Sequence, residues 1–278
     1  MNDIFDKVKG TTKVFTVIGY PVKHSLSPVI HNTMAQITGT DFIYTAMEVE
    51  PENLREAIVG AHCLGIRGIN VTVPHKVAVM DLVCDIDKRA KAIGAVNTLK
   101  YTDKGYVGYN TDVIGSAYAI KNNGYDIKNK TVLLLGAGGA GNACAVMACE
   151  EGCEKLIIAN RTVEKAEKLA ENIRKYYNCP IEAVSLNDID GIKKCDLIIN
   201  CTTIGFGDKT GLSPIKNKNF YSEKQVEFVF DAIYMPWETQ LLKDAKEMGV
   251  KTLNGFSMLV YQAVAADEIW FDEKYDIK

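Results

Sequence analysis

The sequence predicts an α/β protein of two domains, and three observations lead to that prediction. The chain has 278 residues, which is long enough for two domains. Its first part alternates apolar strand-like runs with helical stretches, as an α/β layer of its own would. Its second part begins with a glycine-rich loop between an apolar run and a helix, the pattern of a Rossmann-type dinucleotide-binding domain.

The first part of the chain contains strands and helices in alternation. Strands are predicted over residues 13–19, 42–49 and 68–73, and helices over about 29–38 and 51–61. Short strands over 95–100 and 106–109 are joined by a turn at 103–105. The run Asn110-Thr111-Asp112 then caps a helix predicted over 113–123.

The second part is organised around the stretch Thr131 to Gly141. Val132 to Leu135 is a continuous apolar run, which suits a strand buried on both faces of a parallel sheet. Gly136 makes the tight turn that follows, Gly138 lets a pyrophosphate approach the backbone, and Gly141 lets strand and helix pack closely. The helix N-terminus offers N–H groups to the phosphates. The G-x-G-x-x-G motif indicates dinucleotide binding here because it lies between a predicted strand and a predicted helix.

The remaining elements continue the alternation. Strands are predicted over 155–159, 181–184, 196–200 and 226–230, and helices over 163–176 and 239–248. The polar stretch 208–222 is the one plausible mobile loop. We expect the last helix, over 257–271, to return to the first domain and to leave a cleft between the two domains.

The residues after the second strand of the Rossmann unit indicate which dinucleotide binds. An Asp or Glu at this point would hydrogen-bond the ribose of NAD. The chain instead has Asn160-Arg161-Thr162, with Lys165 one turn further on. The guanidinium of Arg161 suits the 2′-phosphate of NADP. We therefore predict NADP as the cofactor.

Charge and hydropathy exclude several classes of partner. The 32 basic and 35 acidic residues give a net charge of -3, so nucleic acid and anionic membranes are disfavoured. No apolar run approaches the roughly 20 residues of a membrane span. The N-terminus lacks the pattern of a secretory signal, so we expect a cytoplasmic protein.

The eight cysteines are scattered singly through the chain. None forms a C-x-x-C motif or is grouped with histidine at zinc spacing. Cys149 and Cys153, four residues apart near a helix end, are a possible metal pair, but small reduced thiols are the favoured interpretation. We expect no metal.

Polar groups gather beside predicted strand ends in the first part of the chain, where ligands of α/β proteins collect. They are Ser25, Ser27, Asn70, Thr72, Lys76, Asn97, Asn110, Thr111 and Asp112. Hydroxyl and amide groups of this kind suit a substrate with several alcohols and a carboxylate better than a phosphate or a metal. For His24, His31, His62 and His75 we expect hydrogen-bonding or ordinary structural roles rather than catalysis.

These residues belong to a series of motifs that runs through nearly the whole chain. The series is Ser25-Leu-Ser27-Pro28, Asn70-Val-Thr72-Val-Pro74-His-Lys76, Gly94-Ala-Val-Asn97-Thr, Gly108-Tyr-Asn110-Thr-Asp112, Gly136-Ala-Gly-Gly-Ala, Asn160-Arg-Thr162, Asn200-Cys-Thr-Thr-Ile-Gly205 and Asn254-Gly-Phe-Ser-Met258 through Gln262. The series resembles that of the shikimate dehydrogenase family.

The resemblance implies NADPH-dependent reduction of 3-dehydroshikimate to shikimate, in the pathway to aromatic amino acids. It implies a substrate-binding and catalytic domain over residues 1–112 plus 256–278 and a Rossmann-type NADP domain over 113–255, in a monomer or homodimer. The catalytic pair implied is Lys76 and Asp112. The substrate-binding residues implied are Ser25, Ser27, Asn70, Thr72, Lys76, Asn97, Asp112, Tyr234 and Gln262. The NADP-binding residues implied are Gly136, Ala137, Gly138, Gly139, Ala140, Gly141, Asn160, Arg161, Thr162, Lys165, Ala232 and Gly255.

Three alternatives stay open at this point. A dual quinate/shikimate dehydrogenase using NAD or NADP is one, because Tyr44 resembles a tyrosine in the pocket of such enzymes. The sequence Asn160-Arg161-Thr162 argues against that interpretation, because it has the pattern of NADP-binding members of the family. A non-catalytic nucleotide sensor and a Rossmann enzyme with an unrelated substrate are the others. The chain also departs from the family at Ser257, where a second glycine is usual.

Overall fold

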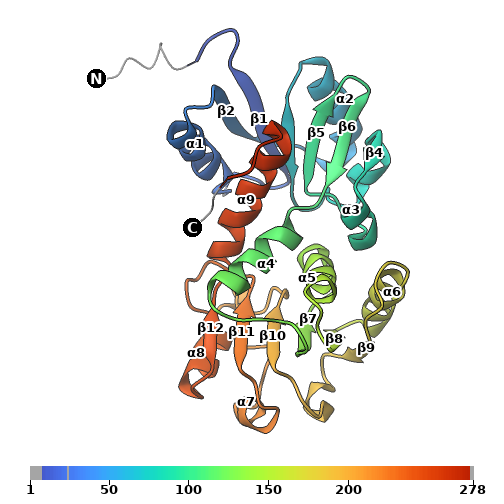
Figure 1. The fold of residues 1–278 in the computed structure, drawn as a ribbon, viewed down its shortest axis with the longest axis vertical. Coiled ribbons are helices and arrows are strands. Elements are labelled where there is room, and N and C mark those ends of the chain that lie inside the picture. Colours follow the sequence, from blue (N-terminus) through green and yellow to red (C-terminus); the bar gives the residue numbers. More distant parts are fainter. Residues whose placement is uncertain (1–7, 24, 276–278) are drawn as a thin grey trace. The chain divides into compact units, whose positions relative to one another are not determined.

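The computed structural model describes residues 8–23 and 25–275, and the chain divides into two compact units. The first unit comprises Met1–Thr111 and Ala263–Lys278, and the second comprises Asp112–Gln262. Over the described residues, each unit contains one six-stranded sheet (Figure 1). The predicted α/β class is confirmed.

The sheet of the first unit is mixed, with the strand order β2-β1-β3-β5-β6-β4. Strand β1 lies between β2 and β3 and is parallel to both, whereas β5 is antiparallel to β3 and β6. The strands are β1 (Lys13–Gly19), β2 (Phe42–Glu48), β3 (Gly68–Val71), β4 (Asp85–Ile86), β5 (Thr98–Thr102) and β6 (Gly105–Tyr109).

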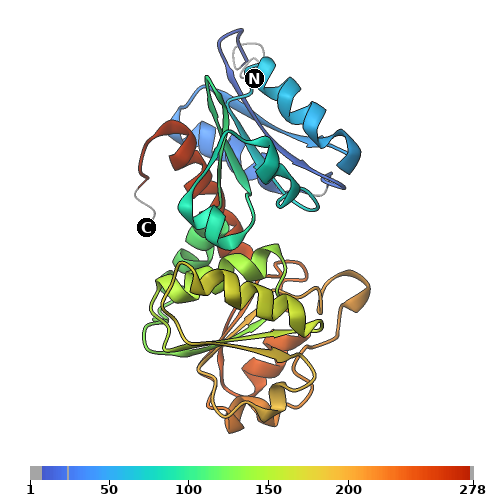
Figure 2. The same ribbon diagram turned by 90° about the vertical axis from the view of Figure 1, so that its right-hand side faces the viewer.

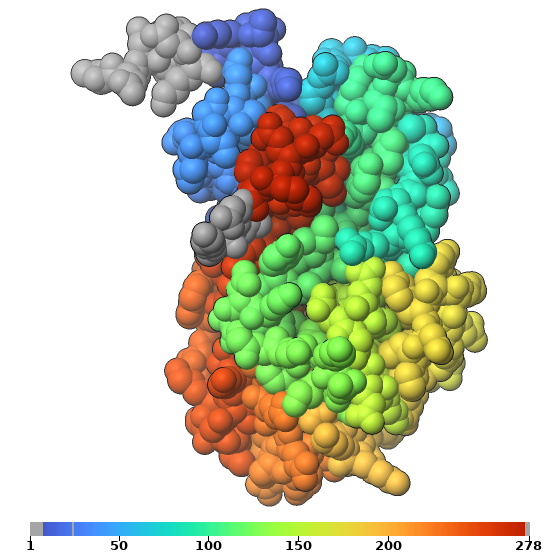
Figure 3. Space-filling model, viewed as in Figure 1, coloured from blue at the N-terminus to red at the C-terminus, as the bar shows by residue number. Residues whose placement is uncertain are grey.

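Helices pack on both faces of this sheet. On one face, Phe15 of β1 and Phe42 of β2 pack with Ala266 and Trp270 near the C-terminus. The space-filling view shows that end of the chain, in red, set against the blue N-terminal segments (Figure 3). The helices of the first unit are α1 (Ser27–Thr38), η2 (Pro51–Asn53), α2 (Leu54–Cys63), η3 (Ala78–Leu82), α3 (Lys88–Ile93) and the second half of α9 (Phe256–Phe271).

The sheet of the second unit is entirely parallel, with the order β12-β11-β10-β7-β8-β9. The order reverses between β7 and β10, which is where a doubly wound sheet binds its ligand. The strands are β7 (Thr131–Leu135), β8 (Lys155–Asn160), β9 (Ile181–Ser185), β10 (Leu197–Asn200), β11 (Phe228–Asp231) and β12 (Lys251–Leu253).

Helices also cover both faces of the second sheet (Figure 2), so its central strands have no polar face. Val132, Leu133, Leu134 and Leu135 of β7 are all fully buried, as their continuous apolar run predicts. The helices of this unit are α4 (Asp112–Asn122), α5 (Gly139–Glu150), α6 (Val163–Arg174), α7 (Asn219–Glu223), α8 (Gln240–Glu247), the first half of α9, and the short η4 (Ile189–Gly191) and η5 (Gly207–Lys209).

The structure corrects the prediction of a mobile loop over 208–222. This stretch contains η5 and the start of α7, and Ile215, Phe220 and Tyr221 lie in the core of the second unit. Because most residues of this stretch are polar, its composition did not indicate that these three side chains are buried in the core. Three further elements, β4, α3 and β12, were not predicted from the sequence, because each is six residues or shorter. Helix α1 begins two residues earlier than predicted, at Ser27.

Candidate active site

Predicted site residues occur in both units. Ser25, Ser27, Asn70, Thr72, Lys76 and Asn97 belong to the first unit. The second unit contains Asp112, Tyr234, Gln262 and the predicted NADP-binding residues. Each group is described within its own unit.

Asn97 is the centre of a buried hydrogen-bond network in the first unit. Its Oδ1 accepts hydrogen bonds from the backbone N–H of Thr111 at 2.8 Å and from the hydroxyl of Thr98 at 2.8 Å. Its Nδ2 donates to Thr111 Oγ1 at 3.2 Å. The side chain of Asn97 is therefore fixed in one orientation, and it fixes Thr111 in turn.

Asn70 on β3 extends this network. Its Nδ2 donates to the hydroxyl of Thr98 at 3.1 Å and to the carbonyl of Asn97 at 3.3 Å. Its Oδ1 accepts a hydrogen bond from the hydroxyl of Tyr44 at 2.6 Å. Burial raises the pKa of Tyr44 well above its usual value, so Tyr44 remains a neutral donor.

Tyr44 also packs against a buried pair of ionisable residues, His31 and Asp267. The ring of His31 stacks on Tyr44 with 4.1 Å between the ring centroids, and His31 Nδ1 lies 2.7 Å from Asp267 Oδ1. Burial raises the pKa of Asp267, and the hydrogen bond to His31 limits that rise. Sequence reasoning gave His31 no special role, because Asp267 is 236 residues away.

The other histidines behave as expected where the structure describes them. His62 Nε2 lies 2.8 Å from the carbonyl oxygen of Thr102, and His75 Nε2 lies 2.8 Å from that of Val49. Both rings thus form hydrogen bonds to the backbone. His24 lies outside the described residues.

The remaining candidates of the first unit sit in short connections. The hydroxyl of Ser25 accepts a hydrogen bond from the backbone N–H of Ser27 at 3.2 Å, where α1 begins. Thr72 follows β3, and its N–H donates to the carbonyl of Ile18 on β1. The carbonyl of Lys76 accepts a hydrogen bond from the N–H of Val96 at 2.8 Å. The backbone of Lys76 is therefore tied to the residue that precedes Asn97.

In the second unit, Asp112 and Gln262 lie on two helices that pack closely. Gly115 shares a face of α4 with Asp112, since the two are three residues apart. A Cβ atom at Gly115 would stand 2.8 Å from the carbonyl oxygen of Met258 and 2.9 Å from Cβ of Gln262. The absence of a side chain at Gly115 thus allows α9 to approach α4 near Asp112.

The glycine loop has the geometry that its sequence predicts. Gly136 has a φ of +100°, and its N–H donates to the carbonyl of Ala159 on β8 at 2.8 Å. A Cβ at Gly141 would stand only 2.0 Å from the carbonyl oxygen of Gly136. At Gly138, by contrast, no described protein atom lies within 4 Å of a Cβ position, so the backbone is open to a ligand. These features fit a bound pyrophosphate at the start of α5.

The residues after β8 link the glycine loop to the predicted ribose site. Asn160 Oδ1 accepts a hydrogen bond from the N–H of Ala137 at 3.1 Å, and its Nδ2 donates to the carbonyl of Thr162 at 2.8 Å. Arg161 and Lys165 are exposed at the start of α6. Their cationic groups can therefore meet a phosphate dianion from solvent.

Two further predicted residues meet at the carboxyl edge of the same sheet. A Cβ at Gly255 would stand 2.1 Å from the carbonyl oxygen of Ala232, so these two backbones are in contact. Gly255 N–H also donates to the carbonyl of Ile233 at 3.1 Å. Tyr234 is the next residue after Ile233, and its side chain is half-buried.

Sequence reasoning missed Asp231, the last residue of β11. Its carboxylate accepts hydrogen bonds from Thr239 Oγ1 at 2.6 Å, Asn200 Nδ2 at 3.0 Å and the N–H of Ile233 at 3.1 Å. Asp231 thereby fixes the loops after β10 and β11. Burial raises the pKa of this carboxyl from 3.8 to about 6, and the three hydrogen bonds limit the rise.

The raised pKa of Asp231 predicts a pH-dependent contribution to stability. Because the folded state binds this proton more tightly, the contribution is complete below pH 3.8 and is lost as the pH rises through 6. The loss amounts to at most about 3 kcal/mol. Relative to the wild type, Asp231→Asn should therefore become more stable by up to this amount between these pH values, as measured by urea unfolding. The exposed Asp208→Asn is the control. A constant difference between Asp231→Asn and wild type across this range would contradict the assignment.

The close contact at Gly115 predicts that Gly115→Ala is destabilising. The new methyl group would collide with the backbone of α9, which costs about 1–3 kcal/mol of unfolding free energy. Gly60→Ala on α2 is a matched control, because no described atom lies within 4 Å of its Cβ position. That control should be neutral or stabilising by up to about 1 kcal/mol. Equal effects of the two substitutions on urea unfolding would refute the packing argument.

Comparison with known proteins yields consistent matches. The family model described as "Shikimate dehydrogenase substrate binding domain" matches residues 17–99, and "Shikimate / quinate 5-dehydrogenase" matches residues 118–205.

Among the described residues, no helix has the length and apolarity to span a bilayer.

Individual relatives match over nearly the whole chain. Proteins named "Shikimate dehydrogenase (NADP(+))" are 42% identical in Caldanaerobacter subterraneus, over 97% of this chain and 95% of the relative, and 44% identical in Methanocaldococcus jannaschii, over 95% and 93%. A solved shikimate 5-dehydrogenase from Listeria monocytogenes, in complex with shikimate and NAD, is 30% identical. It has a TM-score of 0.90 and covers 97% of this chain and 95% of its own.

Proposed function

The chain belongs to the shikimate dehydrogenase family, and on this basis we propose that it catalyses the reversible, NADPH-dependent reduction of 3-dehydroshikimate to shikimate. This reaction lies on the pathway to aromatic amino acids. Of the features within the chain, the buried network of Asn70, Asn97 and Thr111 supports the proposal most strongly. It holds amide and hydroxyl groups in fixed positions, as recognition of a polyhydroxylated ring requires.

The substrate is recognised through its carboxylate and its hydroxyl groups. Hydroxyl, amide and phenol side chains serve this purpose, each able to donate a hydrogen bond without a charge of its own. The residues proposed are Ser25, Ser27, Asn70, Thr72, Asn97, Tyr234 and Gln262.

Lys76 and Asp112 are the proposed catalytic pair. When bound, NADPH supplies a hydride to the ketone carbon. Lys76 stabilises the negative charge that grows on the ketone oxygen and donates the proton that converts it to the alcohol. The role proposed for Asp112 is to orient the ammonium of Lys76 toward that oxygen during the reaction. In the reverse direction the pair accepts the alcohol proton.

Backbone contacts of the first unit support this pairing. The carbonyl of Lys76 is hydrogen-bonded to Val96, and the N–H of Thr111 to the side chain of Asn97. Val96 and Asn97 are adjacent in the chain, and Asp112 follows Thr111 directly. The peptide units that carry the two proposed catalytic residues are thus tied to neighbouring points.

The role of Lys76 predicts a specific kinetic loss. Lys76→Ala removes a cation that acts in the transition state, so kcat should fall on the order of 10²-fold or more with little change in KM. Initial rates of shikimate oxidation, followed by NADPH absorbance, measure both constants. Lys91→Ala, which removes a surface lysine of the same unit, should retain normal rates. A kcat for Lys76→Ala near that of the wild type would exclude Lys76 from the chemical step.

The cofactor is proposed to be NADP, which would be held by the glycine loop and by Asn160, Arg161, Thr162, Lys165, Ala232 and Gly255. The relatives named above as NADP(+) enzymes support this choice. The exposed guanidinium of Arg161 is suited to two parallel hydrogen bonds to the 2′-phosphate.

Arg161 therefore predicts a change in coenzyme preference. Arg161→Ala should raise KM for NADP+ by about tenfold or more, since a charged hydrogen bond contributes about 1.5–3 kcal/mol. KM for NAD+, which has no 2′-phosphate, should change little. Lys168→Ala is the control, because Lys168 is an exposed lysine on α6, the helix that follows Arg161. If Arg161→Ala raised KM for both coenzymes equally, Arg161 would not be the residue that recognises the 2′-phosphate.

Two alternatives can be separated by the same assay. Preference for quinate is disfavoured, because the hydroxyl of Tyr44 is engaged with Asn70 and its side chain is 2% exposed. Rates with shikimate and quinate, each with NADP+ and NAD+, test this directly. The absence of any turnover would favour a nucleotide sensor or a Rossmann enzyme with an unrelated substrate.

The setting of the enzyme belongs to the same proposal. We propose a cytoplasmic monomer or homodimer that needs no protein or nucleic-acid partner for catalysis. Sedimentation of the purified protein at assay concentrations distinguishes the two oligomeric states.

A further inference from the structure

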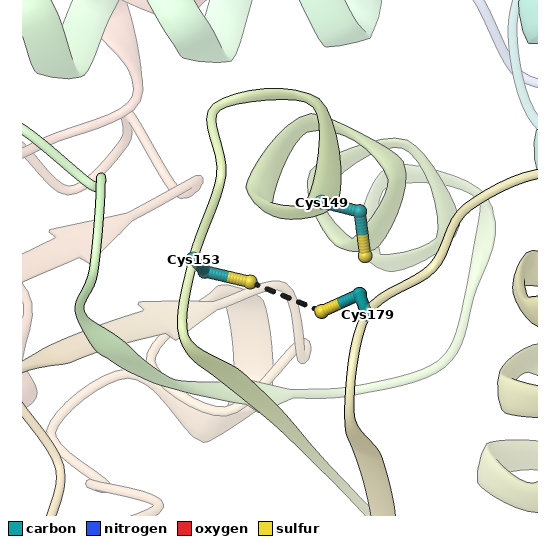
Figure 4. Close-up of side chains that lie close together, drawn as sticks. All are labelled: Cys149, Cys153 and Cys179. Atoms are coloured by element: carbon teal, nitrogen blue, oxygen red, sulfur yellow. Dashed lines mark hydrogen bonds between the residues drawn. The ribbon is translucent and has the colours of Figure 1, made fainter.

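Three cysteines of the second unit converge at one point. Cys149 lies in the last turn of α5, Cys153 precedes β8, and Cys179 lies between α6 and β9. Their side chains point toward one another (Figure 4). All three Sγ atoms lie within 4.8 Å of one another, and those of Cys153 and Cys179 are 3.4 Å apart.

The spacing of the sulfur atoms fits a shared metal ion. A Zn–S bond of about 2.3 Å in a tetrahedral site places sulfur atoms about 3.8 Å apart. The separation of 3.4 Å between Cys153 and Cys179 is slightly below this value and no separation exceeds 4.8 Å, so small side-chain rotations suffice. A disulfide would instead need about 2.05 Å between two sulfur atoms and would leave the third without a role.

The backbone holds the three positions before any ligand arrives. Gly152, with a φ of +75°, turns the chain at the end of α5, and the N–H of Cys153 returns to the carbonyl of Ala148 at 3.0 Å. On the other side, the N–H of Leu156 donates to the carbonyl of Pro180, next to Cys179. The cluster thus joins three segments that backbone hydrogen bonds of α5, β8 and their neighbours already hold.

Burial and charge also suit a metal–thiolate centre. Cys153 is buried, whereas Cys149 and Cys179 are partly exposed, which gives an ion access from solvent. Cys179 lines a surface hollow together with Arg174 and Lys175. Three thiolates carry one net negative charge around Zn²⁺ and two around Cu⁺, and the two cations that line the same hollow as Cys179 favour an anionic centre there.

We propose that Cys149, Cys153 and Cys179 form a three-thiolate site for a thiophilic metal ion, either Zn²⁺ or Cu⁺. Each thiol releases its proton to solvent on ligation. Water can take the fourth position of a Zn²⁺ ion, while Cu⁺ is satisfied by three soft ligands. This reverses our sequence-based expectation of no metal, which considered Cys149 and Cys153 without a third ligand.

The site is structural rather than catalytic. The cysteines lie at the amino ends of β8 and β9, whereas the glycine loop follows the carboxyl end of β7. Because the strands are parallel, these are opposite edges of one sheet. Metal binding should therefore stabilise the second unit and leave the kinetics of shikimate oxidation unchanged.

Metal binding to the reduced, chelator-treated full-length protein tests the proposal under anaerobic conditions. Titration with Zn²⁺ or Cu⁺ against a chromophoric chelator should give one ion per chain, and Co²⁺ should give a thiolate charge-transfer band. Each of Cys149→Ser, Cys153→Ser and Cys179→Ser should weaken binding by about tenfold or more. Cys63→Ser and Cys84→Ser, which alter exposed cysteines elsewhere, should bind as the wild type does.

Further outcomes decide the matter independently of activity. A rise in Tm with metal in the wild type, absent in Cys179→Ser with a wild-type circular dichroism spectrum, would support the site. Binding unaffected by all three substitutions would overturn it. So would a Cys153–Cys179 disulfide, identified by mass spectrometry in metal-free protein, that persists under the reducing conditions of the titration.

Discussion

The hydrogen bond from the backbone N–H of Thr111 to Asn97 Oδ1 is the contact on which the candidate site most depends. It anchors Thr111, the last residue of the N-terminal segment of the first unit, to the residue directly before β5, and Asp112 begins α4 immediately afterwards. Because Asn97 is itself held through Thr98 and Asn70, the anchor is rigid. Asp112, one of the two proposed catalytic residues, thus follows a residue whose backbone is held in place.

The interior next to this anchor contains several buried polar side chains. Tyr44, Asn70, His31 and Asp267 are all buried, and each meets a hydrogen-bond or stacking partner. Buried polar groups are costly when unpaired, so such a network favours one arrangement of the side chains over all others. Directional precision of this kind is what recognition of several hydroxyl groups demands.

Much of this fold was accessible from the amino-acid sequence, for definite physical reasons. The buried run Val132 to Leu135 and the glycines that follow it specify a strand, a turn and a helix almost without regard to the rest of the chain. Short elements such as β4 and β12 escaped notice because two or three residues carry no period. Their existence depends on neighbours supplied by the sheet.

The site was predictable only in part. Motif residues such as Asn70 and Asn97 could be selected because polar groups at strand ends are informative. Partners far apart in the chain could not be paired, which is why His31 with Asp267 and Cys179 with Cys153 were missed. Asp231 escaped because an acid at the end of an apolar strand resembles an ordinary turn residue.

Helix α9 has a consequence for how the protein is made. Its second half, from Ala263 onward, belongs to the first unit, where Ala266 and Trp270 pack against Phe15 and Phe42. Synthesis therefore reaches Gln262, the last residue of the second unit, before it reaches the residues that complete the interior of the first unit. In the nascent chain Phe15 and Phe42 lack these partners until the residues after Ala263 have been made, and their apolar surface stays available to chaperones until then.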